Sequence, residues 1–195
     1  RPSGSKGPVA VRLSSFERYY AEEAWTWELQ ALTRLRPVAG DEALGAAVLK
    51  LAHATLSRER DAAQTLAEVA AMRARMDSER RAKSPWDLKL APGGLTDIEF
   101  AAQALQLVHA AASPEVLASN TGAALARLAA AGCLDPDAAA RLHDGWRLWT
   151  ELQQVLRLSV EDEFAPADAP ERLRRRLAAL LRAEDVDAAV KARQA

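Results

Sequence analysis

Cysteine is almost absent from this sequence, which has 195 residues and a single thiol at Cys133. One cysteine cannot form an internal disulfide framework or a metal site built from several thiolates. Such low cysteine usage is typical of proteins that work in a reducing compartment. We therefore expect a cytoplasmic protein.

The chain also has few aromatic residues, little net charge and no long apolar run. Aromatic residues make up 5% of the chain and the formal net charge is -1. A nearly neutral chain creates no global field that attracts nucleic acid or an anionic membrane. No apolar run reaches the ~18 residues that a membrane-spanning helix needs. We expect neither a nucleic acid nor a membrane as partner, and the start, without Met or signal peptide, resembles the middle of a longer chain.

The composition and the apolar spacing predict a mainly α protein. Hydrophobic residues make up 49% of the sequence, and Ala, Leu, Arg and Glu lose little side-chain entropy in helices. Apolar residues at steps of three and four predict helices over roughly 15–36, 41–55, 60–80 and 96–108, others starting at Ser113-Pro114 and Asp135-Pro136, and at least one after Asp168. The helix after Asp135 has the clearest apolar stripe, formed by Leu142, Trp146, Trp149, Leu152 and Leu156.

Local signals suggest where some elements begin. Ser14 with Glu17, and Thr96 with Glu99, have the spacing of a capping box at a helix start. We expect Asp41 and Asp135 to cap the helices that follow them. Two short segments, residues 9–11 and 86–90, have the pattern of brief strands. The sequence thus predicts a helical bundle with a small irregular or β segment.

The first eight residues, RPSGSKGP, could contact a phosphate group. Glycines allow close approach of a ligand, Ser5 can donate a hydroxyl, and Arg1 and Lys6 supply positive charge. The order of residues does not match the phosphate-binding loop GxxxxGK[ST]. A flexible chain end explains the same composition.

A second candidate lies around the glycine pair Gly93-Gly94. Free backbone N–H groups before a helix can form an anion-binding concavity, but Asp97 and Glu99 in the first helical turn oppose an anion. These acids suit a divalent cation, ribose hydroxyls or helix capping. We expect Glu99 to be chiefly a capping residue and Asp97 to be a site residue, although Lys89 could also pair with Asp97.

A third candidate is the segment Trp25-Thr26-Trp27-Glu28 with Arg34 and Arg36. The two tryptophans are ~200° apart around a helix. We expect one of them in the core and the other on a stacking or interface surface. Both arginines could reach a triphosphate, but arginines at a solvated helix end are more common.

Together these segments resemble one family. RPSGSKGP, AWTWELQALTRLRPVAGD and DLKLAPGGLTDIEFAAQALQL, in this order, are similar to the C-terminal, adenylylating half of bacterial glutamine synthetase adenylyltransferases. The resemblance runs from Arg1 to about Leu158. The half that removes AMP usually has RPEG at the first motif. Related PII uridylyltransferases share a version of the Lys…Gly-Gly…Asp segment but lack the tryptophan motif.

The resemblance implies a polymerase-β-like nucleotidyltransferase domain followed by a helical domain. Residues 1–12 would then be the last edge of the catalytic domain, and residues 13–195 the helical bundle. Such enzymes use ATP and Mg²⁺ to transfer AMP to a tyrosine of glutamine synthetase, which regulates nitrogen assimilation, and they respond to the PII protein through other parts of the chain. The metal-binding Asp-x-Asp of the family has no counterpart here, so we expect the chain alone to be inactive.

The predicted contacts to nucleotide or substrate are Arg1, Ser5, Lys6, Arg34, Arg36, Lys89, Asp97 and Glu99. No catalytic residue and no metal ligand are predicted within the chain. Two alternatives remain open: a non-catalytic helical module that regulates a partner enzyme, and a fragment of a related uridylyltransferase.

Overall fold

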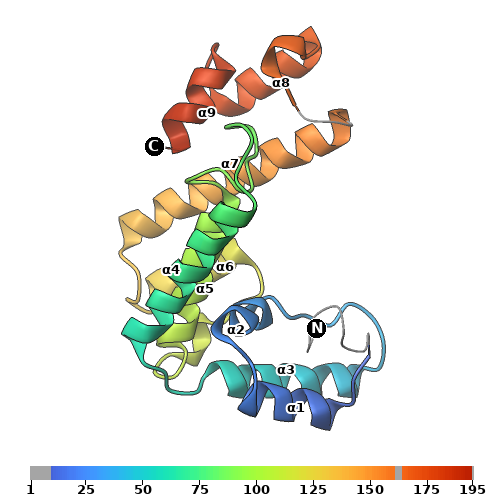
Figure 1. The fold of residues 1–195 in the computed structure, drawn as a ribbon, viewed down its shortest axis with the longest axis vertical. Coiled ribbons are helices and arrows are strands. Elements are labelled where there is room, and N and C mark those ends of the chain that lie inside the picture. The colour runs from blue at the N-terminus through green and yellow to red at the C-terminus, as the bar shows by residue number, and fades with distance from the viewer. Residues whose placement is uncertain (1–9, 161–163, 195) are drawn as a thin grey trace. The chain divides into compact units, whose positions relative to one another are not determined.

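The computed structural model describes residues 10–160 and 164–194, and within these ranges it contains helices and no β-strand. The mainly α class is thereby confirmed. The helices, in chain order, are α1 (Leu13–Glu22), α2 (Thr26–Thr33), α3 (Glu42–Leu56), α4 (Ala62–Glu79), α5 (Leu95–His109), the 3₁₀ helix η2 (Pro114–Val116), α6 (Thr121–Ala130), α7 (Pro136–Ser159), the 3₁₀ helix η3 (Pro166–Asp168), α8 (Glu171–Leu181) and α9 (Val186–Gln194) (Figure 1).

The strand expected over residues 86–90 is wrong. The segment forms successive turns, in which the Asp87 N–H donates to the Ser84 carbonyl at 3.1 Å and the Leu90 N–H donates to the Asp87 carbonyl at 3.1 Å. Backbone groups that are satisfied locally are not available to a strand partner. In the other expected strand, Ala10 and Val11 are not extended into a sheet, and Val9 lies outside the described residues.

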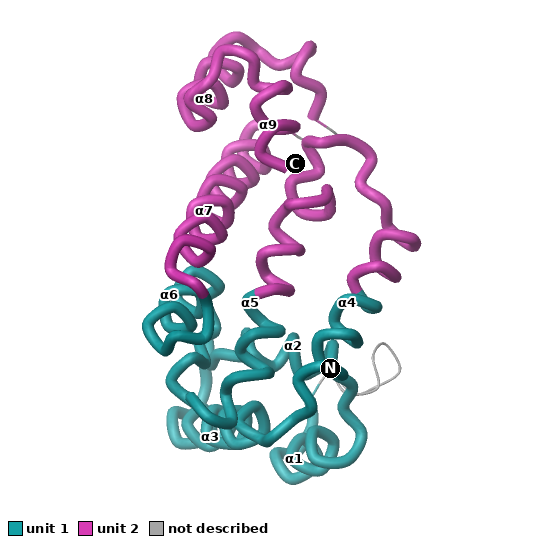
Figure 2. Tube along the Cα trace, turned by 90° about the vertical axis from the view of Figure 1, so that its left-hand side faces the viewer, with its two compact units in different colours: residues 1–72, 102–134 teal, residues 73–101, 135–195 magenta. Residues whose placement is uncertain are grey.

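The chain forms two compact units, which Figure 2 distinguishes by colour. Unit 1 comprises residues 1–72 and 102–134, and unit 2 comprises residues 73–101 and 135–195. The boundary falls within α4 and within α5, so each of these helices contributes residues to both units.

Aliphatic side chains from several helices form the core of unit 1. The buried members are Leu32, Ala52, Leu56, Leu107, Ala110, Val116, Leu117 and Leu128. Phe16 and Tyr20 of α1 pack against this cluster, with their ring centroids 4.6 Å apart. Burial of these side chains, at ~25 cal/mol per Å² of apolar surface, is the main term that holds the short helices of this unit together.

The start of α2 depends on the buried carboxylate of Glu28, which is 6% exposed. Glu28 accepts hydrogen bonds from the Trp25 backbone N–H at 3.1 Å and from the Tyr19 hydroxyl at 2.5 Å. This arrangement leaves both indoles outside: Trp25 is 71% exposed and Trp27 is 46% exposed. The expectation that one of the two tryptophans lies in the core is therefore wrong.

Helix α7 confirms the apolar stripe predicted for it. Trp149 and Leu152 are buried, and Leu142, Trp146 and Leu156 are half-buried. Helix α7 contacts α8, and α8 contacts α9. The buried side chains of α8 are four residues apart, at Leu173, Leu177 and Leu181, which is the spacing of one helix face.

Aspartate caps were predicted more accurately than capping boxes. Asp41 accepts the Leu44 N–H at 2.7 Å, and Asp135 accepts the Ala138 N–H at 2.9 Å. The box of Ser14 with Glu17 is wrong, because α1 begins at Leu13 and has no side-chain cap.

The helix expected after Ser113-Pro114 is a short 3₁₀ turn. Helix α6 starts later, at Thr121, where the Asn120 side chain accepts the Ala123 N–H at 3.0 Å. Asn120, and not Ser113, is thus the residue that caps α6 and sets its start.

Candidate functional site

The turn that leads into α5 uses its own carbonyl groups to satisfy the start of that helix. The Leu95 N–H donates to the Leu88 carbonyl at 2.9 Å, and the Thr96 N–H donates to the Lys89 carbonyl at 3.0 Å. The Gly94 N–H donates to the Ala91 carbonyl at 2.9 Å. These donors are the ones that an anion would otherwise meet at a helix N-terminus, so the glycine pair does not form an open anion-binding concavity.

Both glycines are required by the tightness of this turn. Gly93 has a φ of +69°, a left-handed conformation that other residues adopt at a cost. A Cβ at Gly94 would lie 2.7 Å from the carbonyl oxygens of both Leu88 and Ala91. The glycine pair therefore has a structural reason within unit 2.

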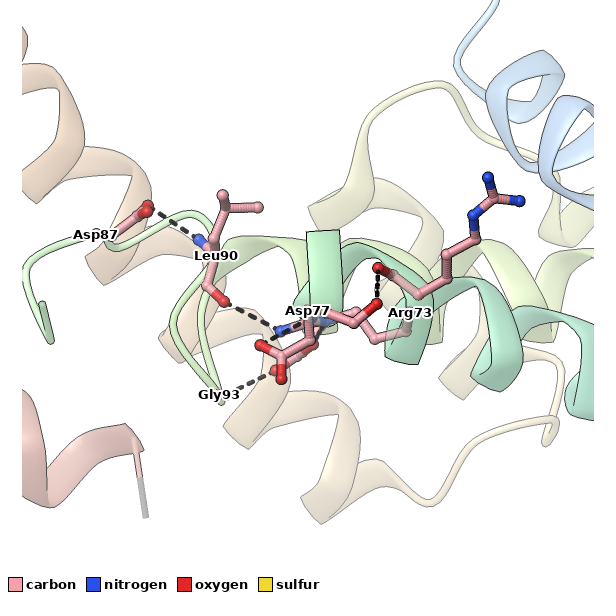
Figure 3. A network of polar contacts seen from close by, with 8 residues as sticks. Arg73, Asp77, Asp87, Leu90 and Gly93 are labelled. Atoms are coloured by element: carbon pink, nitrogen blue, oxygen red, sulfur yellow. Dashed lines mark hydrogen bonds and ion pairs between the residues drawn. The ribbon is translucent and has the colours of Figure 1, made fainter. Parts of the chain in front are cut away.

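Asp97 is held by partners within unit 2. Its carboxylate pairs with Arg73 Nε and accepts the Gly93 N–H at 2.7 Å. Arg73 also donates to the Leu90 carbonyl at 3.1 Å and lies 3.9 Å from Asp77 (Figure 3). The partner of Asp97 is thus Arg73 and not Lys89, whose side chain is exposed.

The capping box of Thr96 with Glu99 is wrong. Helix α5 begins at Leu95, so Thr96 is already inside its first turn and is 3% exposed. The side chain that bonds back to the turn is that of Asp97, by way of the Gly93 N–H. Glu99 is half-buried in the same turn of the helix.

Residues from α7 and α9 fix the turn from its other sides. The Trp149 indole N–H donates to the Gly93 carbonyl at 3.0 Å, and the Gln194 amide donates to the Pro85 carbonyl at 2.7 Å. The Trp86 indole N–H donates to Asp187 at 3.0 Å. Hydrogen bonds from Lys191 and then from Trp86 lower the pKa of the Asp187 carboxyl.

A pocket of about 410 Å³ lies beside Asp97 within unit 2. Arg141 and Arg193 line it together with Trp149 and the Gly93 backbone. Its lining combines two guanidinium groups with a carboxylate that Arg73 already neutralises. This charge balance can accept an anionic group and does not favour a cation.

We expect Asp97→Asn to lower the free energy of unfolding by about 1–3 kcal/mol, because it removes the charge that Arg73 meets. The asparagine retains an oxygen for the Gly93 N–H. The matched control is Asp77→Asn, whose side chain is 50% exposed and 3.9 Å from the same arginine. That change should stay within about 0.5 kcal/mol. Denaturant titration of the chain measures both, and equal losses would contradict a special role for Asp97.

The predicted site residues are distributed over both units. Arg34 and Arg36 follow α2 in unit 1 with exposed side chains, whereas Lys89, Asp97 and Glu99 belong to unit 2. Arg36 lines a pocket of about 380 Å³ within unit 1. The remaining predictions, Arg1, Ser5 and Lys6, lie outside the described residues.

Sequence reasoning missed Arg73 and Arg127. Arg73 is separated from Asp97 by 24 residues, and no sequence spacing signals such a pair. Arg127 donates to the Leu117 carbonyl and lines the same pocket as Arg36. Its position in an amphipathic helix is compatible with an ordinary solvated arginine.

The described residues do not form a metal site. No group of three or more His, Cys, Asp or Glu side chains that could hold an ion occurs among them. Asp-x-Asp spacings do occur at Asp135 and Asp137 and at Asp185 and Asp187. Asp135 and Asp185 cap helices, however, and Asp187 is bonded to Trp86 and Lys191.

None of the helices that the structure describes combines the length and apolar character needed to cross a lipid bilayer.

Comparison with known proteins finds two matching family models and several bacterial relatives. The family model described as glutamate-ammonia ligase adenylyltransferase matches residues 1–51, and the model described as GlnD PII-uridylyltransferase matches residues 60–191. A relative from Caulobacter vibrioides is 52% identical over 83% of this chain and 16% of its own length. Relatives from Xanthobacter autotrophicus and Rhodopseudomonas palustris are 44% and 45% identical over 91% and 95% of this chain, and 18% of their own length in each case.

These relatives are all named bifunctional glutamine synthetase adenylyltransferase/adenylyl-removing enzyme. The chain spans less than a fifth of their length, with 16% for the Caulobacter protein and 18% for the other two. Residues 60–191 correspond to a region that the PII-uridylyltransferase model also describes. With this identity over most of its length, the chain belongs to the family of bifunctional glutamine synthetase adenylyltransferase/adenylyl-removing enzymes.

Proposed function

We propose that this chain is part of an enzyme that transfers AMP from ATP to a tyrosine of glutamine synthetase and thereby regulates nitrogen assimilation. The observation that carries the proposal is the 52% identity, over 83% of the chain, to a protein named for this activity. The motifs of the adenylylating half, Arg1 to Gly4 and Trp25 to Glu28, favour transfer of AMP over its removal. The PII protein would act through other parts of the enzyme.

We also propose the domain division that the resemblance implies. Residues 1–12 would close a polymerase-β-like nucleotidyltransferase domain, and residues 13–195 would form the helical domain. The start of the first described helix, α1, at Leu13 supports this division.

ATP and Mg²⁺ are the cofactors of the proposed activity, and the described residues do not fit the metal. The acid in the best position, Asp97, already pairs with Arg73 and the Gly93 N–H, and a guanidinium beside a carboxylate opposes a divalent cation. We place the metal carboxylates in the part of the enzyme that lies outside this chain. The mechanistic contribution of these residues is therefore positioning and charge, not metal chemistry.

The helical domain would contribute contacts to nucleotide or protein substrate. We propose this role for the exposed cations Arg34, Arg36 and Lys89, for Asp97 where it lines its pocket, and for Glu99. Arg1, Ser5 and Lys6, which precede α1 in the sequence, complete the proposed set. Lys89 has a rigid support, because its backbone carbonyl accepts the Thr96 N–H at the start of α5.

Transfer of UMP to the PII protein is a second candidate, since residues 60–191 match the PII-uridylyltransferase model. The relatives at 44% and 45% identity cover that region as well and are named adenylyltransferases. The tryptophan motif of residues 25–28 also favours the adenylyl reaction. A non-catalytic module that regulates a partner enzyme is the remaining alternative.

An assay with labelled ATP and UTP, with glutamine synthetase and the PII protein as acceptors, tests the proposal. The chain alone should label neither acceptor. The same chain, joined to the other regions of the full-length enzyme, should attach AMP to glutamine synthetase. Labelling by the chain alone would show that its own residues suffice for the chemistry. Labelling of the PII protein by UTP in place of the adenylyl reaction would establish the uridylyl alternative.

A further inference from the structure

Unit 1 contains a pocket of about 380 Å³ between α2, α3 and the segment that enters α6. Sites for small molecules in proteins have volumes of about 300–1,000 Å³. The pocket is therefore large enough for a compact metabolite.

The charge of the pocket is positive without any opposing acid. Arg36 and Arg127 line it, and no Asp or Glu is among its lining residues. Arg127 is fixed in place by hydrogen bonds to the carbonyl groups of Leu117 and, at 3.5 Å, of Glu115. Guanidinium groups present paired donors that match the oxygens of a phosphate or carboxylate.

One wall of the pocket is apolar. Leu32, Leu56 and Leu117 line it and are 3%, 2% and 4% exposed. Ser119 and Asn120 provide polar groups at the segment before α6. A ligand with an apolar body and one anionic end would suit both kinds of lining. Its anionic end would pair with the arginines, and its apolar body would contact the leucines, so no charged group would be buried against an apolar one.

A larger groove in unit 2 is the competing candidate. It has a volume of about 750 Å³ and is lined by Arg141, Arg147, Arg182 and Arg193, but Asp144 and Glu151 line it too. Those acids offset part of its positive charge. The pocket of unit 1 lacks this offset and is the stronger anion site.

We propose that the unit 1 pocket binds a small organic anion, with its apolar body against Leu32 and Leu117 and its phosphate or carboxylate group between Arg36 and Arg127. The proposal concerns binding by this chain and does not depend on the adenylyl transfer proposed above. The proposed ligands are amphipathic monoanions and dianions. Their anionic group would contact the positive charge of Arg36.

Titration calorimetry of the chain with three aromatic probes tests the proposal. Phenyl phosphate and phenylacetate carry the two anionic groups, and phenol carries neither. We expect at least one anionic probe to bind at least ~10-fold more tightly than phenol, a difference of ~1.4 kcal/mol. The better anion identifies the group that the pocket prefers. Equal binding of all three probes, or no binding of either anion, would overturn the proposal.

Three variants locate the binding within the molecule. Arg36→Gln removes an exposed charge, and Ala123→Leu fills the pocket from an exposed position in the first turn of α6. Each should lower the affinity for the preferred anion at least ~10-fold. Arg58→Gln removes an exposed arginine that does not line the pocket and should leave the affinity unchanged. Equal affinities of all variants would place the anion elsewhere and refute the assignment.

ATP as a further probe separates this inference from the proposed function. Competition between ATP and the preferred anion, lost in Arg36→Gln, would make the pocket part of the nucleotide site. Anion binding that ATP does not disturb supports the pocket and argues against Arg36 as a nucleotide contact.

Discussion

Replacing Trp149 by Ala should lower the free energy of unfolding by about 3–5 kcal/mol. The side chain is 2% exposed in the middle of α7, and its indole N–H donates to the Gly93 carbonyl at 3.0 Å. The substitution therefore removes a large buried surface and leaves the carbonyl of a tight turn without its donor. Denaturant titration followed by circular dichroism measures the change.

Trp149→Phe separates the two contributions of this side chain. The phenyl ring retains most of the packing and lacks the N–H group, so a loss of about 1–3 kcal/mol is expected from the unsatisfied carbonyl. A loss below ~1 kcal/mol in Trp149→Ala would contradict burial of the side chain. It would favour a partner surface on α7 and hence the non-catalytic binding module.

Replacing Gly94 by Ala should cost about 3 kcal/mol, the upper part of the usual range for overpacked sites. The added Cβ would lie 2.7 Å from two backbone carbonyl oxygens, of Leu88 and of Ala91. Backbone atoms cannot rotate away as a side chain can. Relief of the clash requires movement of the turn and of the first residues of α5.

Gly145→Ala is the matched control for the same chemical change. Its added Cβ would lie 3.3 Å from the Ile98 Cδ1 atom, the far end of a flexible side chain. Gly145 is inside α7, where alanine is favoured over glycine by about 0.5–1 kcal/mol, so we expect no loss of stability. Thermal melting of the two variants compares them directly. A melting temperature of Gly94→Ala equal to that of the unmodified chain would show that the turn is looser than described.

Most helices could be predicted from the sequence because their cause is local. Apolar residues at steps of three and four mark α3, α4, α5 and α7, and Asp41 and Asp135 cap their helices as expected. A capping aspartate contacts N–H groups that are a few residues away in the chain. Its effect therefore depends little on the rest of the fold.

Two of the wrong predictions depend on backbone partners that the local residue pattern does not reveal. The alternating pattern of residues 86–90 suits a strand as well as it suits a turn with Trp86 and Leu88 buried. Which of them forms depends on whether a neighbouring strand exists, and the described residues contain none. Thr96 has the right spacing to Glu99 for a cap, but carbonyl groups at residues 88 and 89 already satisfy the helix start.

The role of Asp97 as a site residue stays a prediction. Its contacts could not be predicted from the sequence, because they come from Arg73 on α4 and from the Gly93 N–H. Arg36 was singled out because it lies near the tryptophan motif in the sequence. Its pocket could not be predicted, because Arg127 and Leu117 reach it from a separate part of the chain.

The bonds between the turn and α9 also have a consequence for the timing of folding. Trp86 and Asp187 are 101 residues apart, and Pro85 and Gln194 are 109 residues apart. Contacts that close such long loops form slowly. At the ~5–20 residues per second of protein synthesis, the ribosome needs several seconds to supply these partners after it has made the turn. During that interval the Trp86 indole lacks its Asp187 acceptor. The turn therefore acquires its full set of hydrogen bonds only after α9 has been synthesised.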